Sequence, residues 1–197
     1  MTRPLEGIRV LDLTNVLAGP FCCYQLAQFG ADVIKVEPPG SGDLARQLGA
    51  DPDLNAVGMG VSFLAQNAGK RSVTINLKHE TGKRLLKRLV ETADVLVENF
   101  RPGVMDKFGL GYDDVTEVNE NVIYVSGSGF GSDGPYADRP GQDLLLQSMS
   151  GLANYTGRKD DPPTPAGTAV VDEHSAMLIA LHTMFALFHK ERTGEGQ

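Results

Sequence analysis

The segment Ile8-Arg9-Val10-Leu11-Asp12-Leu13 is followed, within about thirty residues, by a helical pattern and by Ala31-Asp32-Val33-Ile34-Lys35-Val36-Glu37. Both quoted segments are rich in the branched apolar residues that favour strands. Between them, Pro20 suits the first turn of a helix over Phe21–Phe29, and Gly30 suits its end. This order predicts a parallel strand–helix–strand unit.

The remainder of the chain continues the alternation. Further strands are expected at 72–77, 94–98 and 122–126, and helices at 79–92, 104–108, 113–119 and 142–150. Residues 44–68 show no clean period and are expected to form a long loop with room for one helical turn. The pattern predicts an α/β fold: an open, mostly parallel, doubly wound (Rossmann-like) sheet with flanking helices and a long buried carboxyl-terminal helix. Residues 1–197 are expected to form one domain.

One carboxylate, Asp172, stands where an apolar run meets that last helix. No Asp, Glu, Lys or Arg occurs from Ser175 to Phe188, and a helix that is apolar all round is a buried one. Two interpretations of Asp172 are open. It could be the N-cap of the helix, or a catalytic carboxylate that the free N–H groups keep ionised. His174 could shuttle a proton beside it or only hydrogen-bond at the helix start.

Composition limits the class of protein. The chain has 197 residues, 41% hydrophobic and 22% charged, with a net charge of −7, so neither a nucleic acid nor an anionic membrane is expected as a partner. The amino terminus is not a signal peptide. Cys22 and Cys23 are adjacent, which fits neither a disulfide framework nor a metal site, and they are expected to be buried and inert. A cytoplasmic protein without a metal is predicted.

Two patterns bear on ligand binding. Gly129–Gly134 matches GxGxxG, but loop residues follow it where the dinucleotide fingerprint needs a helix. Cations lie near predicted strand ends, and together they could form a phosphate site, with Phe100 stacking on an adenine; these cations are Arg46, Lys70, Arg71, Arg101 and Lys107. The alternative is ordinary solvated surface charge.

Several stretches, taken in order, resemble one family. They are Leu5–Asp12, Leu17–Pro20, Leu26–Gly40, Asn67–Ser72, Val97–Gly103, Gly129–Gly131, Gly134–Tyr136, Arg139–Gly141 and Glu191–Gln197. The chain is similar over essentially its whole length to the class III CoA-transferases, which include formyl-CoA and carnitine CoA-transferases and α-methylacyl-CoA racemase.

The resemblance implies a mechanism and a ligand. Asp172 would attack an acyl-CoA thioester, pass through a mixed anhydride and an aspartyl-CoA thioester, and transfer CoA to a small carboxylic acid. Coenzyme A would be bound as substrate and product, and the full-length enzyme would form an interlocked homodimer. The implied CoA site comprises Asn15, Val16, Leu17, Ala18, Arg46, Lys70, Arg71, Ser72, Asn99, Phe100, Arg101 and Lys107.

The sequence departs from the family in two ways. Gln142 stands where the racemase branch has a histidine, and it cannot act as a general base, which disfavours racemisation. The acyl pocket is expected near Gln142, Gly131 and Tyr136. The chain also has about half the usual length, so it is expected to be an amino-terminal portion. Besides transfer, a 2-methylacyl-CoA racemase and an inactive CoA-binding fragment stay open.

Overall fold

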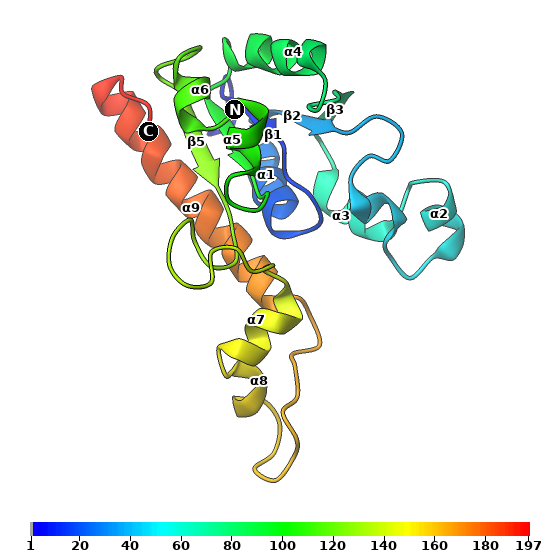
Figure 1. The fold of residues 1–197 in the computed structure, drawn as a ribbon. Helices are drawn as coiled ribbons and strands as arrows, with labels where there is room; N and C mark the ends of the chain where they lie inside the picture. The colour runs from blue at the N-terminus through cyan, green and yellow to red at the C-terminus, as the bar shows by residue number, and fades with distance from the viewer. Residues whose placement is uncertain (1) are drawn as a thin grey trace.

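The computed structural model describes residues 2–197 and centres on a five-stranded sheet of order β3-β2-β1-β4-β5, in which all neighbours are parallel (Figure 1). The register places Leu11 beside both Ile34 and Leu96. The strands are β1 (Arg9–Asp12), β2 (Asp32–Glu37), β3 (Arg71–Thr74), β4 (Val95–Glu98) and β5 (Ile123–Ser126). The predicted fold class is confirmed.

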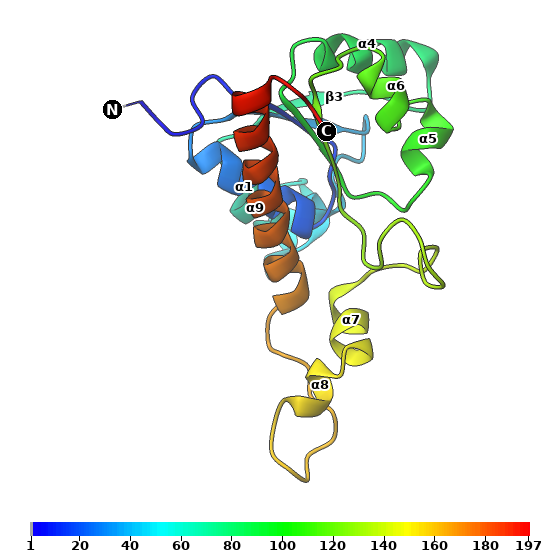
Figure 2. The same cartoon turned by 90° about the vertical axis from the view of Figure 1, so that its left-hand side faces the viewer.

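Helices cover both faces of the sheet. Figure 2 shows α1 and α9 on one face and α4, α5 and α6 on the other, which is the doubly wound arrangement. The helices are α1 (Ala18–Gln28), η1 (Leu44–Gln47), α2 (Pro52–Ala56), α3 (Val61–Asn67), α4 (Glu80–Val90), α5 (Val104–Phe108), α6 (Tyr112–Thr116), α7 (Asp143–Met149), α8 (Leu152–Tyr155) and α9 (Val170–Thr193). Helices α7 and α8 project from the carboxyl ends of the strands (Figure 1).

Each face of the sheet has its own apolar core, because strand side chains alternate between faces. Val10 and Val33 pack with the buried, unbonded thiols of Cys22 and Cys23 on the α1 and α9 side. On the other side the core contains Leu11, Leu13, Ile34, Leu86, Val90, Leu96, Leu110 and Val115. The prediction of buried cysteines is confirmed.

The predicted long loop at 44–68 is wrong. This segment contains η1, α2 and α3. The carboxylate of Asp51 accepts the N–H groups of Asp53 and Leu54, and Pro52 begins α2, so helix-start chemistry is present. Helices of five to seven residues are too short to show an apolar period, and this explains the miss.

Helix α9 also differs from expectation. It begins before Ser175, and only a narrow face is covered, by α1, β5 and α7. That face carries the small residues Ala176, Ala180 and Thr183, while Phe185 and Phe188 lie largely exposed on the outer face. The prediction of burial on all sides is therefore wrong for residues 2–197. Within those residues, no helix combines the length and apolar character needed to cross a membrane.

Two buried lysines tie β1 and β2 to the loops at their carboxyl ends. The Nζ of Lys70 lies 2.8 Å from Asp12 Oδ2 and 2.8 Å from the carbonyl oxygen of Pro20. The Nζ of Lys35 lies 2.8 Å from Asp43 Oδ2 and 2.9 Å from the carbonyl oxygen of Thr14. Burial alone would raise the pKa of Asp12, but Lys70 and Lys35 outweigh it and lower that pKa. Both ammonium groups are therefore fully paired.

We predict that Lys70→Met destabilises the protein by about 3–5 kcal/mol, because it leaves the buried carboxylate of Asp12 short of a partner. The neighbouring Arg71→Met is the matched control. Its guanidinium is mostly exposed and pairs with Asp32, so its loss should cost less than about 1 kcal/mol. Urea unfolding of both variants measures the difference. Equal losses would contradict the prediction.

Candidate active site

Asp172 lies in the first turn of α9, beyond the carboxyl ends of the strands. Strand β5 runs toward α7, and α9 begins at that same end (Figure 1). Two turns further along α9, Ile179 lies against the residue that follows β5: a Cβ added to Gly127 would be 3.0 Å from its Cδ1. Asp172 thus lies about two helical turns beyond the residue that follows β5, on the side of the sheet where ligands bind in open parallel sheets.

The first turn of α9 is capped by a side chain from another helix. Oδ1 of Asp143, the first residue of α7, accepts the backbone N–H of Val171 at 2.7 Å and of Asp172 at 3.2 Å. The residue before α9 is Ala169, which has no side-chain cap. The N-cap interpretation of Asp172 is therefore wrong, and the N–H groups expected to keep Asp172 ionised are donated to Asp143 instead.

A second residue of α7 holds the segment that leads into α9. Gln147, one turn after Asp143, is almost fully buried. Its Oε1 accepts the N–H of Ala166 at 2.8 Å, and its Nε2 donates to the carbonyl oxygen of Thr168 at 3.3 Å and to the carboxylate of Asp143. One helix face therefore fixes residues 166–172.

The carboxyl group of Asp172 is held in an unfavourable place for a charge. Burial raises its pKa, and the nearby carboxylates of Asp143 and Glu173 raise it further. Glu173 itself accepts a hydrogen bond from the hydroxyl of Thr168. The ionised form of Asp172 is therefore less favoured than that of a free aspartate.

The loop after β1 is fixed from two sides. Asn15 and Asn99 exchange hydrogen bonds: Asn99 Oδ1 accepts the N–H of Asn15 at 2.8 Å, and Asn99 Nδ2 donates to its carbonyl oxygen at 2.9 Å. The N–H of Val16 donates to Asp43 Oδ1 at 3.1 Å, and that of Leu44 to Asn15 Oδ1. These bonds hold Val16 at a φ of +71°, which is strained for a β-branched residue.

A cleft of about 180 Å³ opens beside this loop, where four strand ends meet. It is lined by Leu13, Thr14, Asn15, Val36, Glu37, Pro38, Asp43, Ile75, Asn76, Leu77, Lys78, Phe100 and Phe108. Lys78 is the cation among them. Ile75–Lys78 were not among the predicted site residues, because the strand was expected over 72–77, whereas β3 ends at Thr74. They follow β3 at its carboxyl end, as Asn15 follows β1 and Asn99 follows β4.

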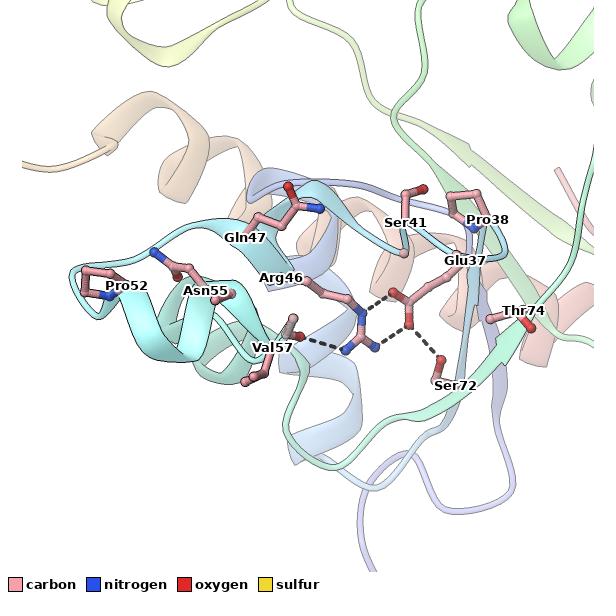
Figure 3. A pocket seen from close by; sticks show the side chains of 14 residues that line it. Glu37, Pro38, Ser41, Arg46, Gln47, Pro52, Asn55, Val57, Ser72 and Thr74 are labelled. Carbon is pink, nitrogen blue, oxygen red and sulfur yellow. Dashed lines mark hydrogen bonds and ion pairs between the residues drawn. The ribbon is translucent and has the colours of Figure 1, made fainter.

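A larger and more open cavity of about 830 Å³ lies between β3 and α2 (Figure 3). Arg46 and Ser72 line it, but both are engaged by Glu37. Arg46 Nε and Nη2 each lie 2.7 Å from its carboxylate oxygens, and Ser72 Oγ lies 2.7 Å from Oε1. Burial opposes ionisation of Glu37, yet these bonds and one from the N–H of Asp43 lower its pKa to about 2. Arg46 also stacks on Phe63.

The structure corrects the expected placement of Lys70 and Arg71 as free cations. Lys70 is buried and bonded to Asp12, Pro20 and Asn67. Arg71 begins β3, at the amino end of the strand, where it pairs with Asp32, the first residue of β2. The ammonium group of Lys70 is thus buried and paired beneath the carboxyl end of β1, and Arg71 lies at the opposite, amino end of the strands, so neither is a free cation.

The remaining predicted residues lie on exposed loops and helix ends. Arg101 and Lys107 are exposed, after β4 and in α5. Gln142 is the residue before α7, and Gly131 lies in the preceding loop, where Arg139 stacks on Tyr136. No helix opens after Gly129–Gly134, as expected. His174 is exposed, and residues 2–197 contain no group of three His, Cys, Asp or Glu side chains that could hold a metal ion.

Comparison with known proteins places these features in context. A family model described as CoA-transferase family III matches residues 5–197. The chain is 43% identical to the succinyl-CoA–L-malate CoA-transferase beta subunit of Chloroflexus aurantiacus, over all of this chain and 48% of that protein. It is 41% identical to formyl-CoA:oxalate CoA-transferase of Escherichia coli, over all of this chain and 47% of that protein. The chain thus spans about half the length of these relatives.

Solved structures agree with the sequence comparison. A CAIB/BAIF family protein from Brucella suis superposes with a TM-score of 0.91 and 38% identity, covering 100% of this chain and 52% of that one. Rv3272 from Mycobacterium tuberculosis gives 0.88 and 40%, covering 98% of this chain and 52% of that one.

We predict that Asp143→Asn lowers the pKa of Asp172. The variant keeps an oxygen that can accept the two N–H groups but removes a neighbouring negative charge, one of the causes that raise this pKa. Carbon-13 NMR titration of Asp-labelled protein measures the change, with Asp160→Asn, in the distant loop after α8, as the control. An unchanged or higher pKa in Asp143→Asn would contradict the prediction.

Proposed function

The chain belongs to CoA-transferase family III, and we propose that residues 1–197 form a single unit carrying the CoA site and the nucleophile of an acyl-CoA:carboxylate CoA-transferase. The observation that carries this proposal is the partly buried Asp172 at the carboxyl edge of the sheet, with a raised pKa and a first helical turn fixed by Asp143.

The proposed reaction begins when a carboxylate oxygen of Asp172 attacks the thioester carbon of the donor. The carbon–sulfur bond breaks, CoA leaves as thiolate, and a mixed anhydride remains. The thiolate then attacks the aspartyl carbonyl, which releases the donor acid and leaves an aspartyl-CoA thioester. The acceptor carboxylate attacks this thioester and releases the thiolate. Attack of the thiolate on the acceptor's acyl carbon forms the new CoA ester and restores Asp172.

The environment of Asp172 favours the first step. Acylation removes a negative charge that burial and two carboxylates disfavour, so part of that electrostatic cost is recovered as the anhydride forms. Anhydride and thioester both keep the acyl group activated, whereas water would hydrolyse them, so water must be excluded from the site.

We place CoA along the carboxyl edge, with the adenine in the 180 Å³ cleft beside Phe100 and the phosphates near Lys78. Arg101, after the carboxyl end of β4, and Lys107, in α5, are further exposed cations. This position accounts for the expected involvement of Asn15, which lines the cleft, and of Asn99, whose hydrogen bonds hold Asn15 in place.

The proposed substrates are an acyl-CoA and a small carboxylic acid. The named relatives act on succinyl-CoA with L-malate and on formyl-CoA with oxalate, so short dicarboxylic acids are the first acceptors to test. A homodimer of the full-length enzyme in the cytoplasm is part of this proposal. The exposed apolar face of α9, with Met177, Leu181, Phe185 and Phe188, supports association.

We predict that Asp172→Asn in the full-length enzyme abolishes CoA transfer, with a fall of several orders of magnitude in kcat and a near-normal thermal midpoint, because the variant keeps the size of the side chain and α9 is capped by Asp143. Hydroxylamine added during turnover should convert Asp172 of the parent to a hydroxamate, detected by peptide mass spectrometry. Transfer at the parental rate would refute the nucleophile assignment.

We predict that Lys78→Ala weakens CoA binding by about 10- to 100-fold, because a charge-assisted hydrogen bond to a phosphate contributes about 1.5–3 kcal/mol. Arg71→Ala, at the opposite edge of the sheet, should bind CoA as the parent does. Calorimetric titration with CoA at two salt concentrations tests both, since losing a phosphate contact also reduces the salt dependence. Equal affinities for parent and Lys78→Ala would remove Lys78 from the site.

A further inference from the structure

Two glycines cross backbone to backbone beside the candidate active site. A Cβ added to Gly129 would lie 2.5 Å from Gly141 Cα, and one added to Gly141 would lie 2.6 Å from Gly129 Cα. Real Cβ atoms essentially never approach so closely. The obstacle is backbone in both directions, so no side chain can rotate to make room. Neither glycine has a left-handed φ, and the requirement for glycine is therefore one of space alone.

The crossing closes the neck of the loop 130–140. Within this loop, the rings of Phe130 and Tyr136 meet edge to face at 5.7 Å, and Arg139 lies over Tyr136 at 4.3 Å. Loops of this shape, with neighbouring ends and internal side-chain packing, are compact units. One end of the neck continues from β5, and the other leads within two residues to Asp143.

Two residues of α7, Asp143 and Gln147, connect the crossing to the proposed nucleophile. Asp143 accepts the N–H groups of Val171 and Asp172, and Gln147 on the same helix holds Ala166 and Thr168. The separation of the two backbones at the neck sets where α7 begins relative to β5. Because Asp143 is the first residue of α7, the position of α7 determines where the first turn of α9 is capped.

We propose that the Gly129–Gly141 crossing is a positioning element for Asp172, acting through Asp143. The proposal deepens the proposed function and rests on it for its kinetic consequence only. With a side chain at either glycine, the backbones must separate, α7 must shift, and the cap on Val171 and Asp172 must weaken. A displacement of about 1 Å at a reacting group can cost about 100-fold in rate.

The test compares Gly129→Ala and Gly141→Ala with Gly167→Ala in the full-length enzyme. Gly167 is the matched control: it stands five residues before Asp172, has no left-handed φ, and an added Cβ there meets nothing within 4 Å. Amide hydrogen exchange at Val171 and Asp172 should quicken about 10-fold or more in both crossing variants and stay at the parental rate in Gly167→Ala. Protection in the middle of α9, at Ala180, should be unchanged in all three.

Kinetics and a double-mutant cycle complete the test. The crossing variants should lose about 10- to 100-fold in kcat with little change in KM for acyl-CoA, because the cleft is not altered. Adding Gly141→Ala to Asp143→Ala should give no further increase in exchange, since both changes act through one contact.

Parental exchange at Val171 and Asp172 in both crossing variants would overturn the proposal, as would additive effects in the cycle. Loss of folding in both variants would also overturn it, because the crossing would then support the whole fold rather than one helical turn. An inactive parent would instead defeat the proposed function, while hydrogen exchange would still decide the role of the crossing.

Discussion

Two ammonium groups without access to water, those of Lys35 and Lys70, determine how the carboxyl edge of the sheet is assembled. A buried charge is tolerated only with partners at close range, so each lysine must draw in oxygen atoms from the segments around it. Lys70 brings together β1, the first turn of α1 and the end of α3 through Asp12, Pro20 and Asn67. Lys35 does the same for the loops that carry Thr14 and Asp43. These ion pairs and hydrogen bonds hold the residues that flank the loop beginning at Asn15.

Asp172, the proposed nucleophile, lies in the opposite electrostatic environment. Asp12 is deeply buried, yet lysines lower its pKa; Asp172 is less buried, yet burial and two carboxylates raise its pKa. The difference lies in the sign of the neighbouring charges. Around Asp12 the favourable pairing stabilises the fold. Around Asp172 burial and the neighbouring carboxylates disfavour the ionised form, and in the proposed mechanism this cost would be relieved when the carboxylate is acylated.

Local sequence patterns predicted the parts of the fold that depend on local chemistry. All five strands were expected from runs of branched apolar residues, and proline and glycine marked the helix of the first crossover. The position of Asp172 at the start of the last helix was also predictable. Its cap was not, because Asp143 is 29 residues away in sequence and no periodicity connects them. A sequence pattern can therefore show where a helix starts without showing which side chain accepts the free N–H groups of its first turn.

The prediction that failed most clearly is that of Lys70 and Arg71 as cations available to a phosphate. Lys70 and Arg71 look alike in the sequence, but the side chain of Lys70 is buried against Asp12, whereas that of Arg71 lies at the amino end of the strands with Asp32. The direction of a side chain beside a strand depends on the strand's register with its neighbours, and here Arg71 pairs with Ile34. Lys78 went unnoticed because the strand-end rule was applied to the start of β3 instead of to its end.

Helix α9 has small side chains on its covered face and large apolar side chains on its outer face. Its covered face carries small residues, Ala176, Ala180 and Thr183, which let the helix approach α1 closely, while its outer face carries large apolar ones such as Phe185 and Phe188. A helix with one side in water has the reverse pattern, with polar residues outside. Covering a phenylalanine side chain is worth about 1.5–3 kcal/mol, so this face strongly favours a second layer. In the proposed function, the helix that carries Asp172 would then also be the helix that a second layer covers.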